Sequence, residues 1–132
     1  MAIDKENILS DNAAGIPLLK VLADNSFDSI LITDASKQGK IIYANKAFKK
    51  LTGYSPAEAI GKTPRVLQGL GTDKKVIARL SSALKNGKKF EGKAINYKKD
   101  GTPFIMYWRV LPIKAGKKIE AWIAIQREGA SI

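Results

Sequence analysis

The fold is decided by residues 89–126, which read KFEGKAINYKKDGTPFIMYWRVLPIKAGKKIEAWIAIQ. This stretch contains three segments rich in β-branched and aromatic residues, and such segments predict strands. They cover residues 89–99, 102–114 and 117–126. Asp100-Gly101 predicts a two-residue hairpin turn after the first segment, and Ala115-Gly116 marks a second turn. The stretch therefore predicts an antiparallel meander of three strands.

Both faces of this meander are apolar. On the middle strand, one face carries Phe104, Met106, Trp108 and Val110, and the other carries Ile105, Tyr107 and Leu111. On the last strand, Trp122, Ala124 and Gln126 share one face. An antiparallel sheet with one face in water alternates apolar and polar residues instead. One face must cover the core, and the other needs a cover from the N-terminal segment in cis or from a second copy in trans.

The residues before the meander predict two more strands and several short helices. Strand patterns cover residues 29–35 and 40–45, and helical patterns cover 4–24, 46–51 and the segments that begin at Ser55 and Asp73. Gly15 and Pro17 interrupt the first helix, and Ser55-Pro56-Ala57-Glu58 forms a capping box. This order predicts an α+β fold with an antiparallel sheet and helices on one face. We expect an N-terminal helical extension at residues 1–24 and the main domain at residues 25–128.

Composition excludes most catalytic chemistry. The 132 residues contain no Cys and no His, so disulfides, the usual zinc sites and Cys-His or Ser-His-Asp nucleophiles are absent. We therefore predict that the chain is not an enzyme. It has no signal peptide and no apolar run of transmembrane length, which predicts a cytoplasmic protein with no membrane association.

The net charge of +11 is unevenly distributed. Residues 36–132 hold 21 basic against 6 acidic residues, a net charge of +15. Most of the basic residues are lysines in turn-like pairs, which is typical of a solvated surface. Nucleic-acid readers favour arginines interleaved with aromatic residues. Binding of nucleic acid or of another anionic surface is therefore the weaker hypothesis.

Several motifs resemble a PAS domain, and specifically its LOV (light–oxygen–voltage) branch. They are Tyr43-Ala-Asn-Lys-Ala-Phe48, Leu51-Thr-Gly-Tyr54, Gly61-Lys-Thr-Pro-Arg-Val-Leu-Gln-Gly69, Asn96-Tyr-Lys-Lys-Asp-Gly-Thr-Pro-Phe104 and Ile123-Ala-Ile-Gln126. The resemblance covers residues 25–127. It implies a five-stranded antiparallel sheet that cups a ligand against short helices, a sensory role, and a site for flavin mononucleotide (FMN) or a related flavin (FAD).

The resemblance also shows how this chain departs from the family. Thr63-Pro64 stands where LOV domains have Asn-Cys, so the photoactive cysteine is missing. Met106 stands where a ring-binding Asn is expected. A second phosphate-binding arginine falls at Ser81, and Arg79 two residues away is a candidate to replace it.

Part of the polar site remains. Arg65 resembles the phosphate-binding arginine, and Gln68, Asn96 and Gln126 match residues that contact the ring or the ribityl chain. The candidate cofactor-binding residues are therefore Thr63, Arg65, Gln68, Asn96, Met106, Trp108 and Gln126. Alternatively, the three amides bond one another or the backbone, Arg65 binds a carbonyl, and Met106 and Trp108 with Trp122 are core residues.

These observations lead to two main hypotheses. The first is a sensory LOV-like domain that binds a flavin or another small planar ligand without a cysteinyl bond. A changed hydrogen bond at Gln126 would then pass the state of the ligand to the outer face of the sheet. The second is a ligand-free PAS module for interaction or dimerisation. In both, the apolar outer face of the sheet is the expected contact for a second copy or an effector domain.

Overall fold

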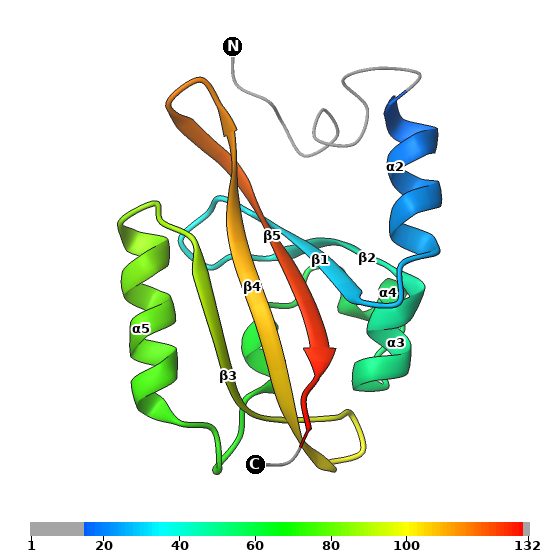
Figure 1. Cartoon of the computed structure of the whole chain (residues 1–132), viewed down its shortest axis with the longest axis vertical. Coiled ribbons are helices and arrows are strands. Elements are labelled where there is room, and N and C mark those ends of the chain that lie inside the picture. The colour runs from blue at the N-terminus through cyan, green and yellow to red at the C-terminus, as the bar shows by residue number, and fades with distance from the viewer. Residues whose placement is uncertain (1–14, 131–132) are drawn as a thin grey trace.

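The computed structural model describes residues 15–130 as an antiparallel sheet of five strands in the order β2-β1-β5-β4-β3 (Figure 1). The strands are β1 (Ser29–Asp34), β2 (Ile41–Ala44), β3 (Phe90–Tyr97), β4 (Pro103–Ala115) and β5 (Lys118–Glu128). The helices are α2 (Gly15–Asp24), α3 (Lys46–Thr52), α4 (Pro56–Ala59), the 3-10 helix η1 (Pro64–Leu67) and α5 (Lys74–Lys85). The predicted α+β fold is confirmed. The predicted helical residues 4–14 lie outside the described residues.

The β3–β4 hairpin differs from the prediction in its turn. The Gly101 N–H donates to the Lys98 carbonyl at 2.9 Å, and the Lys98 N–H donates to the Thr102 carbonyl at 2.9 Å. The loop therefore has three residues, 99–101, and not the two predicted. Gly101 has a φ of +89°, which fits the left-handed position that closes a three-residue hairpin loop.

Three of the helices begin at a residue whose side chain caps the helix N-terminus. Ser55 and Glu58 form both bonds of the predicted capping box at the start of α4. Asn45 caps α3 by accepting from the Phe48 N–H at 3.1 Å, and Asp73 caps α5 by accepting from the Lys75 N–H. Sequence analysis did not predict η1, which begins after Thr63 with Pro64 in its first turn.

The core lies between one face of the sheet, here called the inner face, and these helices. The helix α3 contacts β1, α4 contacts β2, and α5 contacts β3. Phe48 of α3 is 0% exposed and Leu67 of η1 is 1% exposed, so both helices bury a side chain against the sheet. No described helix lies over the opposite, outer face, which is turned toward the viewer in Figure 1. The helix α2 stands at the β1–β2 side of the sheet and does not itself cover the outer face, and the rest of the N-terminal segment lies outside the described residues.

Candidate functional site

Four of the predicted site residues meet on the inner face of three adjacent strands. Asn96 lies on β3, Met106 and Trp108 on β4, and Gln126 on β5. Trp108 pairs directly with Gln126 in the register of β4 and β5. All four side chains are buried, since none is more than 6% exposed. The strand alternation seen in the sequence is therefore what brings them together.

Asn96 carries an unsatisfied polar atom. Its Nδ2 donates to the Met106 sulfur at 3.5 Å, which is a weak bond because a thioether is a poor acceptor. Its Oδ1 is buried and has no hydrogen-bond partner. Leaving a buried acceptor unpaired costs about 1–3 kcal/mol. Such a cost in a native fold calls for an explanation, and a missing ligand donor is one.

Gln126 is held from the neighbouring strand by Ser29. The Ser29 Oγ donates to Gln126 Oε1 at 2.9 Å, and both residues are 2% exposed. The two residues are cross-strand partners in the β1–β5 register. A hydroxyl can donate or accept, so Ser29 can follow either orientation of the Gln126 amide. Sequence analysis missed Ser29, and only the strand register identifies it.

The Trp108 ring packs against Phe90 of β3, with 5.1 Å between ring centroids and 48° between planes. The Arg79 guanidinium lies over the same Phe90 ring, 4.7 Å from its centroid. Arg79 Nη1 also donates to the Glu91 carbonyl at 2.9 Å. Arg79 is therefore bound to β3, and its role as the replacement for an arginine at Ser81 stays a prediction.

The other three predicted residues lie on η1 or at its ends. Thr63 is the N-cap residue but makes no side-chain capping bond, and Gln68 follows the helix and is half-buried. Arg65 is exposed. Within residues 15–130, the side chains of Arg65 and Gln68 make no hydrogen bond to another residue. Leu67, between them, belongs to the core cluster that contains Met106 and Trp108, so η1 lies against the inner face.

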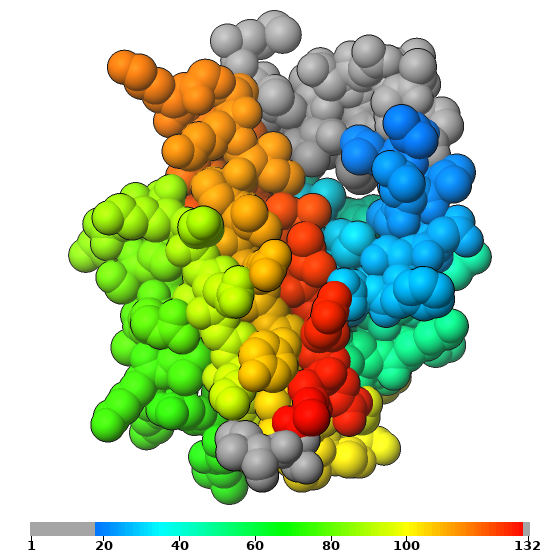
Figure 2. All heavy atoms as spheres, in the orientation of Figure 1, coloured from blue at the N-terminus to red at the C-terminus, as the bar shows by residue number. Residues whose placement is uncertain are grey.

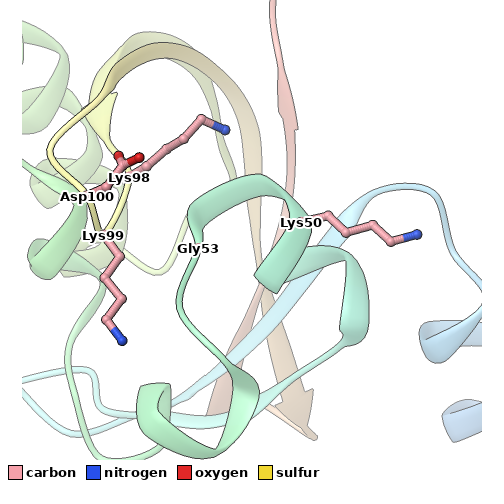
Figure 3. Close-up of a pocket in the computed structure, with 5 residues that line it drawn as sticks. All are labelled: Lys50, Gly53, Lys98, Lys99 and Asp100. Carbon is pink, nitrogen blue, oxygen red and sulfur yellow. The ribbon is translucent and has the colours of Figure 1, made fainter.

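A separate hollow of about 440 Å³ lies between the end of α3 and the β3–β4 hairpin (Figure 3). It is lined by Lys50, Gly53, Lys98, Lys99 and Asp100. The Lys98 ammonium donates to the Leu51 carbonyl at 2.7 Å, and the Lys99 ammonium pairs with Glu58 at 2.8 Å. Figure 3 shows the three lysines pointing in different directions, so they do not converge on one anion. We assign this hollow a structural role.

The described residues show neither a cluster of metal ligands nor a membrane-spanning helix. No group of three or more His, Cys, Asp or Glu side chains within residues 15–130 is placed to hold a metal ion. No helix in that part of the chain is long and apolar enough to cross a bilayer.

Comparison with known proteins agrees with this geometry. Residues 28–128 match the family profile described as PAS domain. A LOV domain from the blue-light-activated histidine kinase EL346 of Erythrobacter litoralis superposes with a TM-score of 0.75 and 30% identity. The match covers 79% of this chain and 97% of that domain. The chain belongs to the PAS family, in its LOV branch. This membership confirms the predicted sensory domain of LOV type and the prediction that it is not an enzyme.

Two curated relatives show how this LOV domain compares with longer proteins. Phototropin-2 of Oryza sativa subsp. japonica is 39% identical over 102 residues, which cover 76% of this chain and 11% of the relative. A blue-light photoreceptor of Listeria monocytogenes is 32% identical over 111 residues, covering 84% of this chain and 44% of the relative. The LOV domain thus spans about a tenth of the rice protein and less than half of the bacterial one.

Proposed function

We propose that this LOV domain binds a flavin, as FMN or FAD, non-covalently on its inner face and senses light or redox state through it. The observation that carries the proposal is the buried, unpaired Oδ1 of Asn96. A hydrogen-bond donor of a bound ring would satisfy this atom. Gln126 supplies a second buried amide on the same face.

The four polar candidate residues each have a role in flavin binding that follows from their chemistry. When bound, the flavin supplies absorption of blue light and acceptance of electrons. Asn96 and Gln126 would orient the ring through their amides. Arg65 is exposed on η1 and makes no bond to the described residues, so its guanidinium is available for a phosphate. Gln68, half-buried beside it, would contact the ribityl chain or the ring edge.

The missing thiol defines the type of sensing. The chain has no cysteine, and Thr63-Pro64 occupies the place of the photoactive one, so no cysteinyl bond from the protein to the flavin can form. The signal must therefore be a change in electron count and hydrogen bonding. Gln126 is the residue through which such a change reaches the sheet, because its Oε1 already contacts Ser29 on β1.

A titration of the purified chain with FMN tests this proposal, with flavin fluorescence as the readout. We expect saturable binding to the wild type, and weaker binding by about 5- to 100-fold in Asn96→Leu, which corresponds to the loss of one buried hydrogen bond. Asn86→Leu, an exposed position at the end of α5, is the matched control and should bind as the wild type does. Riboflavin, which lacks the phosphate, should lose the contribution of Arg65. Absence of saturable binding, or equal affinity of Asn96→Leu and the wild type, would contradict the proposal.

A second candidate function is a ligand-free interaction module, and one observation favours it. Met106 and Trp108 belong to a single packed core cluster, and Trp108 stacks on Phe90. These bulky side chains occupy inner-face positions that a ligand would share. The same titration separates the two functions, because a filled core predicts that neither FMN nor riboflavin binds.

A further inference from the structure

Residues 62–72, here called the η1 strap, cross the inner face from one edge of the sheet to the other. At the β2 edge, Ile41 makes two backbone bonds, from the Gly61 N–H at 2.9 Å and to the Lys62 carbonyl at 2.8 Å. In the middle, Leu67 of η1 is buried in the core. The strap ends at β3, the opposite edge strand, and runs behind the sheet in Figure 1. A ligand held between η1 and the inner face is therefore enclosed by this strap.

At the β3 end, side-chain hydroxyl groups hold the strap. The Gly71 N–H donates to the Tyr97 hydroxyl at 2.8 Å. The Thr72 hydroxyl donates to the Ile95 carbonyl at 2.7 Å and accepts from the Gly69 N–H at 3.0 Å. Thr72 is buried and leads into α5, which contacts β3, so its position is fixed. Within residues 15–130, the bond to Tyr97 is thus the one direct hydrogen bond between the sheet and the loop that precedes Thr72.

The Tyr97 side chain lies directly against two glycines of this loop. A Cβ atom at Gly69 would lie 2.4 Å from Tyr97 Cδ1 and Cε1, and one at Gly71 would lie 2.7 Å from the Tyr97 hydroxyl oxygen. Only glycine permits so close an approach without displacing the ring or the backbone. Leu70, between the two glycines, is fully exposed and adds no packing. In Figure 2 the green segment that precedes α5 lies at the surface, next to the end of β3. The loop therefore has open solvent beside it once the contact with Tyr97 breaks.

Both partners in this contact adjoin residues of the proposed flavin site. Asn96 precedes Tyr97 on β3 and its side chain points to the inner face. Successive side chains of a strand point to opposite faces, so Tyr97 points to the outer side and meets the loop at the edge of the sheet. Gln68, which follows η1, precedes Gly69 at the start of the loop. The contact thus connects the end of η1 to the strand that carries Asn96.

We propose that Tyr97 is a latch on the η1 strap and sets the rate at which a flavin enters and leaves the inner face. Release of the Gly71 N–H frees the loop, and Gln68 and the adjoining end of η1 then move away from Asn96. The β2 end stays attached, because two backbone bonds hold it. Tyr97 is a positioning residue, since it acts on the ligand only through the loop. The proposal rests on the proposed flavin site, but the latch is also present without ligand and is measured separately.

Stopped-flow binding of FMN to the full chain tests the passage of the ligand. Tyr97→Phe keeps the ring and removes one hydrogen bond, so the association and dissociation rate constants should both rise by about 2- to 13-fold. The Kd should stay the same, because the bond is lost from the free and the loaded chain alike. Tyr107→Phe is the matched control, since its hydroxyl, on the outer face, makes no hydrogen bond within residues 15–130. Unchanged rates, or faster dissociation alone with a weaker Kd, would overturn the proposal.

Gly71→Ala provides a second variant that acts on the same contact. In the wild type the added Cβ atom would lie 2.7 Å from the Tyr97 hydroxyl oxygen and would push the loop away. Without that oxygen, the nearest atom of the ring is Cζ at 3.8 Å, which is an ordinary contact distance. Gly71→Ala should therefore raise both rate constants, and the double variant with Tyr97→Phe should be no faster than Tyr97→Phe alone. Additive effects of the two substitutions would overturn the latch.

Amide hydrogen exchange of the ligand-free chain, followed by NMR, measures the latch without flavin. The Gly69 N–H keeps its own acceptor, Thr72, in Tyr97→Phe, so it reports opening of the whole loop. We expect it to exchange about 2- to 13-fold faster in Tyr97→Phe. The Gly101 N–H, which donates to the Lys98 carbonyl in the β3–β4 turn, should be unchanged. If FMN does not bind, the passage fails together with the flavin site, and the Gly69 exchange still decides the latch. If FMN binds and this exchange does not respond, the latch alone is overturned.

Discussion

Replacing Asn96 with Leu should stabilise the ligand-free domain while weakening its flavin site. The wild-type side chain is 3% exposed, leaves Oδ1 unpaired, and makes one weak bond from Nδ2 to the Met106 sulfur. Leu has the same branching and the same number of side-chain heavy atoms as Asn, and it carries no polar atom. Removing an unpaired buried acceptor recovers about 1–3 kcal/mol, so we expect the free energy of unfolding to rise by about 1–2 kcal/mol.

Asn45→Leu is the control for Asn96→Leu, because it makes the same substitution at a buried asparagine whose amide is fully hydrogen-bonded. Asn45 is also buried, at 0% exposure, but its amide makes four hydrogen bonds. It accepts from the N–H groups of Ile30 and Phe48 and donates to the carbonyls of Ala23 and Asp28. At about 1 kcal/mol for each bond, its loss should lower the free energy of unfolding by about 4 kcal/mol. The same substitution then has opposite signs at two buried asparagines.

Urea unfolding followed by circular dichroism measures both variants, first without flavin and then with excess FMN. FMN should raise the stability of the wild type, because a ligand that binds the folded state stabilises it by mass action, and should raise that of Asn96→Leu less. If Asn96→Leu lowers the stability of the ligand-free chain by more than about 1 kcal/mol, its Oδ1 has a partner and the reasoning is refuted.

Three further substitutions, and one control, have defined outcomes. Burial, and after it the neighbouring Asp24 carboxylate, raises the pKa of Tyr43 from 10.0 to about 12, so the folded chain holds this proton more tightly than the unfolded chain. The stability that this shift contributes is complete below pH 10 and is lost between pH 10 and pH 12. Tyr43→Phe should remove that part of the pH dependence, which unfolding at stepped alkaline pH would show. Ser55→Ala removes the N-terminal cap of α4 and should lower the free energy of unfolding, measured by heat or urea, by about 1 kcal/mol. Ser81→Ala, at an exposed position of α5, is its control and should change that free energy little. Met106→Asn should strengthen FMN binding about 10-fold by adding one ring bond and should destabilise the ligand-free chain; equal affinity would mean that no ring atom lies beside Met106.

The sequence was sufficient for the parts of the fold that depend on local patterns. Strict alternation along β4 placed Met106 and Trp108 on the inner face, and the Ser55 capping box identified the start of α4. The inner-face site also followed from this alternation, since Gln126 has the same parity as Trp122 on β5. Such features need only the period of a strand or the spacing of a cap.

The remaining features depend on contacts between distant residues. The bond from Ser29 to Gln126 joins residues 97 positions apart, and only the β1–β5 register brings them together. The same holds for Asn45, whose amide links α2, β1 and α3. The 3-10 helix η1 is four residues long, too short to leave a periodic pattern. The attachment of Arg79 to β3 depends on how α5 packs on that strand, and the spacing of residues along the sequence does not predict this packing.

The most direct test of flavin sensing without a thiol is the absorption spectrum of the chain after incubation with FMN and gel filtration. We predict a structured blue-light band that elutes with the protein, fades under blue light when an electron donor is present, and returns in air. Denaturation should release all of the FMN unchanged, because the chain has no cysteine to form an adduct with it. A spectrum without this band after incubation would contradict the account and leave the packed core around Trp108 as the interior of a ligand-free module.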